Sequence, residues 1–158
     1  MAKNTNRDEF SAPTKRLLEK HSGHHCSNPS CRQITSAASS DGKTTISIGE
    51  ASHITAAAPG GPRYNASLTS EERKSLNNGI WLCKDCAKAI DSKDPYFTEK
   101  LLIAWKRQAN KATWHSIVEK VPFPPDPTIP TDEELRARLK QAATADLAVF
   151  QKADTWPS

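Results

Sequence analysis

The chain has 158 residues, of which only 36% are hydrophobic and 25% charged, so we expect one domain with a small core. A core of this size usually needs additional stabilisation, such as a bound metal ion. A net charge of +4 permits nucleic-acid binding. The sequence lacks a run of about 18 apolar residues that would predict a membrane span, and its polar N-terminus lacks the apolar core of a secretory signal, so we expect a cytoplasmic protein with reduced cysteines.

Residues 1–9 are polar, and we expect them to be frayed. Residues 11–21 predict a short helix, with Pro13 at an early position and Gly23 after its end. Residues 35–44 are rich in Ser, Thr and Ala and predict a surface loop. Residues 45–48 alternate polar and apolar side chains, as a half-buried strand does, and we expect His53 in a strand over about residues 47–54.

The middle of the chain begins with a long loop over residues 56–68 that contains the sequence PGGP. Thr69 and Glu72 then form a capping-box pattern, which predicts a helix over residues 69–76, and Gly79 is expected to end this helical unit. Residues 80–82 predict a short second strand, and residues 87–91 begin a helix. Thr98 is expected to cap a longer helix to about residue 120, because its apolar residues recur at helical spacing.

Five prolines within residues 121–130 predict a stiff, extended linker and the best domain boundary. Thr131 and Glu134 form another capping-box pattern, which opens an amphipathic helix to about Gln151. This helix has nothing to pack against. We therefore expect residues 131–158 to connect to a sensor or regulatory domain or subunit, or to dock on a second copy of the chain. A self-contained protein with a loosely attached tail is the alternative.

The four cysteines come in two closely spaced pairs, Cys26 with Cys31 and Cys83 with Cys86. Zinc prefers tetrahedral ligation, and each pair can fill two corners of the tetrahedron. We therefore expect a structural zinc whose binding free energy contributes to folding. The neighbouring His24 and His25 are alternative ligands, and free buried thiols or redox chemistry are alternative interpretations.

The order Cys-x4-Cys, strand histidine, Asn-x4-Cys-x-x-Cys and helix resembles the HNH endonucleases, the ββα-metal nucleases, over about residues 20–118. The stretches CSNPSC, SIGEASHITAAAPGGPRY, LTSEERKSLNNGIWLCKDCAKAID and LLIAWK are similar to HNH domains that serve as effectors in bacterial anti-phage systems. The resemblance implies an α+β fold with a small ββα-metal (HNH/His-Me finger) core and a structural zinc knuckle. This core would span about residues 24–95 of a nuclease domain 1–120, with a supporting helix over about 98–120, a linker at 121–130 and a helical connector at 131–158.

The resemblance also implies a metal-dependent endonuclease that hydrolyses double-stranded DNA with little sequence specificity. In the family, the first-strand histidine is the general base that activates water, and His53 takes that place. A neutral imidazole can accept a proton at cellular pH. The family's central asparagine, which holds the hairpin and orients the histidine, corresponds to Asn78, with Asn77 as the weaker candidate.

Two positions depart from the family pattern. Ser52 stands where many members have an acidic metal ligand, with Glu50 nearby, and Ala87 stands where a histidine usually follows the second cysteine pair. Asp91 follows Ala87 by one helical turn, on the same face. We infer that Asp91 supplies the metal carboxylate, helped by Glu50 or the Ser52 backbone. Oxygen ligands suit Mg²⁺ or Mn²⁺. The departures leave open a catalytically degenerate zinc module that binds nucleic acid or protein.

Basic side chains on the domain are expected to contact DNA phosphates, which give affinity without reading sequence. They are Arg63, Arg73, Lys74, Lys88, Lys106 and Arg107. For any single lysine, a solvated charged face is the alternative. A nuclease of this kind needs restraint, so we expect its activity to depend on assembly controlled by the regulatory part. A third interpretation is a structural adaptor whose C-terminal helix is the working surface.

Overall fold

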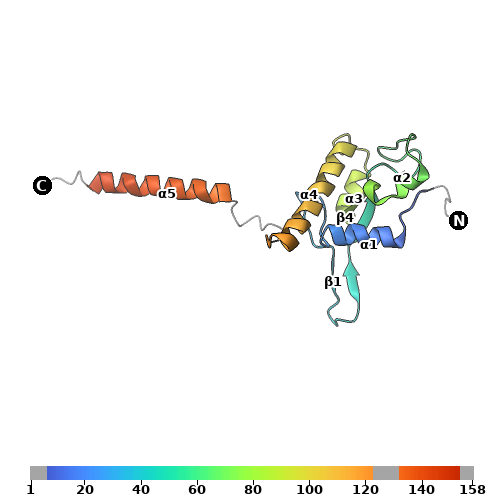
Figure 1. Ribbon diagram of the computed structural model, residues 1–158, viewed down its shortest axis with the longest axis horizontal. Helices are drawn as coiled ribbons and strands as arrows, with labels where there is room; N and C mark the ends of the chain where they lie inside the picture. The colour runs from blue at the N-terminus through green and yellow to red at the C-terminus, as the bar shows by residue number, and fades with distance from the viewer. Residues whose placement is uncertain (1–6, 123–131, 154–158) are drawn as a thin grey trace. The chain divides into compact units, whose positions relative to one another are not determined.

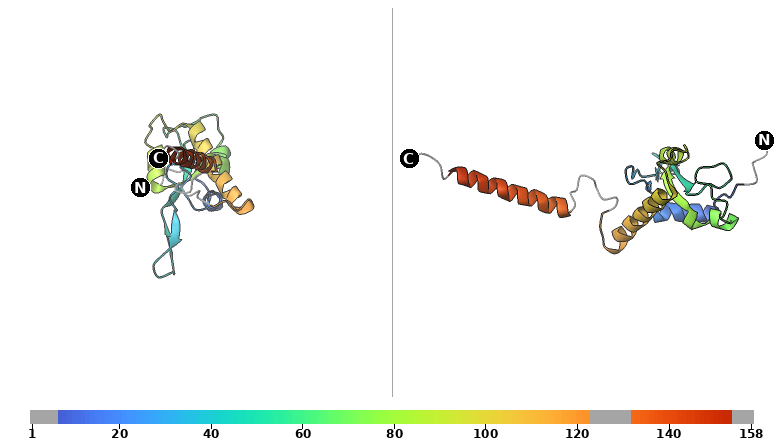
Figure 2. Two further views of the ribbon diagram at one scale, coloured as in Figure 1. Left: turned by 90° about the vertical axis from the view of Figure 1, so that its left-hand side faces the viewer. Right: turned by 90° about the horizontal axis from the view of Figure 1, so that it is seen from above.

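The computed structural model describes residues 7–122 and 132–153, and in these ranges it shows an α+β fold with two small antiparallel sheets (Figures 1 and 2). The chain divides into the units Met1–Phe123 and Pro124–Ser158. In the described ranges, no helix combines the length and the apolar character needed to cross a membrane. Most of the predicted linker and the predicted Thr131 cap lie outside the described residues.

The first helix, α1 (Ala12–His21), begins where the sequence predicts it. The Ser11 side chain caps it by accepting a hydrogen bond from the backbone N–H of Thr14, and Pro13 lies in the first turn. The helix buries Leu18. Phe10, which precedes the cap, is also buried, so the chain is already fixed before the helix begins.

Strands β1 (Ser36–Ala38) and β2 (Thr45–Ser47) form a hairpin that projects from the body of the first unit (Figures 1 and 2). The strand predicted over residues 45–48 is present as β2, but the expectation that it is half-buried was wrong: every residue of β2 is exposed, and Ile46 is 55% exposed. The prediction of an irregular loop over residues 35–44 was also wrong in part, since β1 lies there. Alternation signals burial only where another layer covers one face of the ribbon.

The second sheet pairs β3 (Gly49–His53) with β4 (Gly79–Cys83), and α3 (Lys84–Ile90) follows β4 directly. His53 lies opposite Gly79. The sequence predicted Gly79 as a helix end, but it is the first residue of β4. A Cβ atom at this position would lie 2.5 Å from Cδ1 of Leu18, so only glycine lets α1 approach the hairpin this closely.

Three further helical segments complete the first unit. Helix α2 (Ser70–Lys74) carries the predicted capping box of Thr69 and Glu72 but is shorter than predicted, because the chain turns extended at Ser75 and continues in the 3-10 helix η1 (Leu76–Asn78). Helix α4 (Glu99–Val118) is capped by Thr98, as expected. The second unit contains α5 (Asp132–Ala153), on which Leu135 and Leu139 are exposed.

The hydrophobic core lies between α4, α3 and the β3–β4 hairpin. Leu102 and Trp105 of α4 pack in one buried cluster with apolar side chains of β4 and α3. Cys26 and Cys83 belong to the same cluster, so two of the four cysteines are part of the core itself. A metal bound there would join the N-terminal segment to the strand and helix that build the core.

Candidate metal centre and candidate active site

All four cysteine sulfurs meet at one point. The Sγ atoms of Cys26, Cys31, Cys83 and Cys86 lie within 4.8 Å of one another, and the residues are free cysteines. The Sγ atoms of Cys31 and Cys83 are 3.9 Å apart, too far for a disulfide. Tetrahedral zinc with bonds of about 2.3 Å would place its sulfur ligands about 3.8 Å apart. The four thiols can therefore bind a metal ion such as zinc.

Local hydrogen bonds position these sulfurs. In the first pair, Asn28 forms a turn in which its backbone carbonyl accepts from the Cys31 N–H at 2.9 Å. Its side-chain Nδ2 donates to Sγ of Cys86 at 3.4 Å. In the second pair, Cys83 is the N-cap of α3, and its sulfur accepts from the Cys86 N–H at 3.5 Å. N–H groups aimed at sulfur favour thiolates, the form that binds metal.

Charge at the cluster also fits a bound cation. Burial raises the pKa of the Cys26 thiol, and it raises the pKa of Cys86 to about 11. A divalent ion reverses this preference, because a coordinated thiol is deprotonated. Arg32 brings positive charge near Cys26, and its Nη1 is the one buried side-chain N or O atom without a hydrogen-bond partner among the described residues. A four-thiolate zinc centre with net negative charge would offset that guanidinium.

His53 lies at the end of β3 and is 8% exposed. Its Nε2 lies 2.7 Å from the backbone carbonyl oxygen of Asp8. The Phe10 ring stacks on the imidazole, with centroids 3.9 Å apart and an interplanar angle of 12°. Asp8 and Phe10, which precede α1, therefore fix the position and the orientation of the imidazole ring.

These contacts determine the protonation state of His53. A carbonyl oxygen can only accept, so Nε2 carries the proton in the neutral ring and Nδ1 holds the lone pair. Burial lowers the pKa of His53, although the Asp8 carbonyl and the Glu9 and Asp91 charges act in the other direction. At neutral pH the ring is therefore neutral, and Nδ1 is able to accept a proton.

A cavity of about 180 Å³ adjoins His53, and its lining includes both candidate carboxylates, Glu50 and Asp91, together with Ser52 and Arg7. Glu50 and Asp91 are exposed. Asp91 is the C-cap of α3, one helical turn after the buried Ala87, and its backbone keeps right-handed helical angles. Among the described residues, only the four cysteines form a group of three or more potential ligands close enough to share an ion.

Asn78 is buried in η1, and its side chain makes four hydrogen bonds. Its Oδ1 accepts from the backbone N–H and the hydroxyl group of Thr55, at 2.9 and 2.8 Å. Its Nδ2 donates to the carbonyl oxygens of Thr55 and Arg73, at 3.0 and 2.9 Å. Asn78 thus fixes the chain directly after His53. Asn77, the second candidate, is exposed.

Replacement of Asn78 by alanine is expected to lower the free energy of unfolding by about 1–3 kcal/mol, because the buried Thr55 N–H loses its acceptor. Asn77→Ala is the matched control, since it removes the same side chain one residue earlier from an exposed position. Urea unfolding of the zinc-loaded protein measures both. Equal effects of the two variants would contradict the assignment of Asn78 as the residue that fixes this loop.

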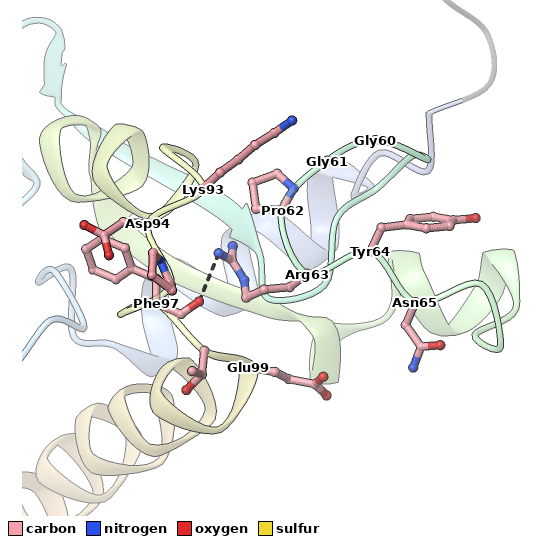
Figure 3. Close-up of a pocket in the computed structure, with 12 residues that line it drawn as sticks. Gly60, Gly61, Pro62, Arg63, Tyr64, Asn65, Lys93, Asp94, Phe97 and Glu99 are labelled. Carbon is pink, nitrogen blue, oxygen red and sulfur yellow. Dashed lines mark hydrogen bonds between the residues drawn. The ribbon is translucent and has the colours of Figure 1, made fainter.

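A second hollow, of about 740 Å³, lies between the Gly60–Asn65 loop and residues 93–99 (Figure 3). The Arg63 side chain points across it toward the Phe97 carbonyl. Its Nε donates to the Ile54 carbonyl at 2.6 Å, and Nη1 donates to the Ile90 carbonyl at 2.7 Å. This hollow is larger than the cavity beside His53. The Arg63 guanidinium that lines it, however, already donates to backbone carbonyls. We therefore take the smaller cavity as the candidate active site.

The six basic residues predicted to contact DNA fall into two groups. Four have partners within the protein: Arg63 as described, Arg73 with Asp8, Lys74 with Glu71, and Lys106 with the Leu76 carbonyl. Lys88 and Arg107 are exposed. Arg63 and Arg73 therefore have a role inside the fold. Lys88 and Arg107 remain the exposed candidates for a phosphate contact.

Residues 7–10 are the part of the site that sequence reasoning missed. Residues 7–9 were expected to be frayed and Phe10 had no predicted role, yet Asp8 and Phe10 contact His53, and Arg7 lines its cavity. The only local signal was Phe10 itself, a large apolar residue directly before a helix cap, where such residues often pack on the helix.

Comparison of the sequence with protein families finds no family that matches the chain, and comparison with curated proteins finds no match.

Proposed function

We propose that the first unit is a metal-dependent endonuclease that cleaves double-stranded DNA with little sequence specificity, with the β3–β4 hairpin and α3 as a ββα-metal core. The observation that carries the proposal is the arrangement at His53. A buried neutral imidazole, fixed through Nε2, adjoins a cavity lined by the Glu50 and Asp91 carboxylates. The resemblance of the motifs to anti-phage effectors extends the proposal to a role in phage defence.

In this proposal, each residue at the cavity has one task. Nδ1 of His53 accepts a proton from the attacking water while the Asp8 carbonyl holds Nε2–H. Arg7, whose side chain is 57% exposed and pairs through Nε with Glu9, would provide its remaining guanidinium N–H groups for a phosphate oxygen. Asn78 keeps the chain after His53 in place. Asp91 and Glu50 would hold Mg²⁺ or Mn²⁺, which is commonly bound by one or two carboxylates and substrate phosphate. When bound, this ion would stabilise negative charge on the leaving oxygen.

Two observations favour the alternative, a catalytically degenerate zinc module that binds nucleic acid or protein. The carboxylates at the cavity do not form a three-ligand group within the described residues, and Ala87 replaces the expected third signature residue. This alternative predicts a stable zinc protein that binds without cutting.

The test is cleavage of supercoiled plasmid by the zinc-loaded full chain, with and without added Mg²⁺ or Mn²⁺. We expect nicked and then linear DNA only when the second metal is added, with zinc content unchanged. Chelators are avoided, because they would also remove the ion from the four cysteines. If the protein cuts with neither metal, even when fused to a dimerising partner, the endonuclease proposal fails, and retardation of the plasmid on a gel would then support the binding module.

A further inference from the structure

The residues before α1 form a strap over His53, which we call the N-terminal arm (Arg7–Phe10). Its backbone is tied down by the Asp8 N–H, which donates to the Ala57 carbonyl at 3.0 Å. The Asp8 carbonyl and the Phe10 ring both contact His53. Every contact that holds the imidazole therefore depends on where this arm lies.

The Asp8 carboxylate anchors the arm to α2. Its Oδ2 is 2.7 Å from Nε of Arg73, and its Oδ1 accepts from the Ser70 hydroxyl. Both side chains are mostly shielded from solvent, with 14% of Arg73 and 20% of Asp8 exposed. The Ser70 hydrogen bond and Arg73 lower the pKa of the Asp8 carboxyl group, so it is ionised at neutral pH.

Arg73 is itself fixed from three sides. Its Nη1 donates to the Leu68 carbonyl, its guanidinium lies over the Tyr64 ring at 5.5 Å from the centroid, and its backbone carbonyl accepts from Nδ2 of Asn78. The contacts therefore run without a gap from Asn78 through Arg73 and Asp8 to the imidazole of His53.

We propose that the ion pair of Asp8 and Arg73 is a positioning clamp for His53, which holds the N-terminal arm so that the Asp8 carbonyl keeps the ring in its Nε2–H form. The role in catalysis rests on the proposed function, whereas the geometric role does not. The side chains of Asp8 and Arg73 contact each other and neighbouring residues of the protein. They would act on the reaction only through His53, so they are positioning residues. The clamp also gives Arg73 a task other than the predicted DNA contact.

The clamp is tested on the zinc-loaded full chain by ¹⁵N NMR of histidine rings, in which the two neutral tautomers give distinct nitrogen signals. The spectrum of His53→Gln identifies the His53 signals. We expect wild type to show the Nε2–H form, and Asp8→Ala to shift His53 toward a mixture of tautomers, although the backbone carbonyl remains. Arg73→Ala should produce the same shift, and the double variant should add little, because both changes release the same arm.

Glu9→Ala is the control, since it removes the neighbouring carboxylate of the arm, which pairs with Arg7 rather than Arg73. It should leave the tautomer of the neutral ring unchanged, although the Glu9 charge acts on the pKa of His53. If Asp8→Ala does not fold, Asp8→Asn removes the charge and keeps the shape, and a smaller shift in the same direction is expected. Unchanged His53 signals in a folded Asp8 variant and in Arg73→Ala would overturn the clamp.

Plasmid cleavage separates this proposal from the nuclease proposal. If wild type cuts, the clamp variants should lower kcat by about ten- to a hundredfold through misplacement of the base. If wild type does not cut but the NMR signals shift, the clamp stands and the endonuclease proposal fails. If wild type cuts and the signals do not shift, the clamp fails alone.

Discussion

Removal of the metal from the four cysteines is expected to abolish the cooperative unfolding transition of the first unit. Structural zinc contributes about 10–16 kcal/mol of apparent binding free energy in zinc-finger peptides, which is comparable to the whole net stability of a typical domain, about 5–15 kcal/mol. Cys26 and Cys83 lie in the main core, so an empty site would also disturb its packing. Cys26→Ser should have the same effect as chelation.

The measurement is near-UV circular dichroism during thermal unfolding, because Trp81 and Trp105 are buried and report on the core. Far-UV signals are less suitable, since α5 belongs to the other unit. Ser30→Ala is the control: it changes an exposed side chain in the same turn and should unfold like wild type. A purified chain that contains no zinc, and whose transition survives both chelation and Cys26→Ser, would refute the metal centre.

The features that the sequence predicted well depend on short stretches of chain. The predicted caps at Thr69 and Thr98 each accept a hydrogen bond from an N–H three residues later, so the pattern and the contact lie within one turn. The meeting of the two cysteine pairs was also predictable, because each spacing already fits one edge of a tetrahedral site.

The features that the sequence did not predict depend on partners distant in the chain. Ile46 alternates like a core residue but lies on a projecting hairpin. Arg63 and Arg73 carry the charge expected of DNA contacts, yet their partners are carbonyl groups and Asp8, up to 65 positions away. Sequence shows that a guanidinium is present, but only the fold shows whether its donors are already used.

The same distinction applies to His53. A histidine in a short strand is a candidate base by position alone, but its tautomer follows from the Asp8 carbonyl, 45 positions earlier. Its neutrality follows from burial under Phe10. Neither could be inferred while residues 1–9 were expected to be frayed. The contacts made by the arm therefore show that Nδ1 is the nitrogen of His53 that can accept a proton.

Replacement of His53 by alanine is expected to lower the rate of metal-dependent plasmid cleavage by about 10²–10⁴-fold, the usual contribution of a positioned general base. The substitution also removes the stacking partner of Phe10 and the donor to Asp8, so the melting temperature must be compared. His115→Ala is the control, because this histidine lies on α4, pairs with Glu119 just after the helix and does not line the cavity. A folded His53→Ala protein that cuts like wild type would eliminate the proposed base.

The pH profile distinguishes a lost base from a damaged fold. Only the neutral ring accepts a proton, so the wild-type rate should rise with pH and level off once His53 is deprotonated. Burial lowers the pKa of His53, so the midpoint of this rise in rate should lie below pH 6.5, about the unperturbed pKa of histidine. The rate should reach its plateau at neutral pH. The residual activity of His53→Ala should lack this rise. A rise that persists in the variant, or one centred above pH 7, would assign the titration to another group, since burial of His53 outweighs the Asp8 carbonyl and the nearby carboxylates and lowers its pKa.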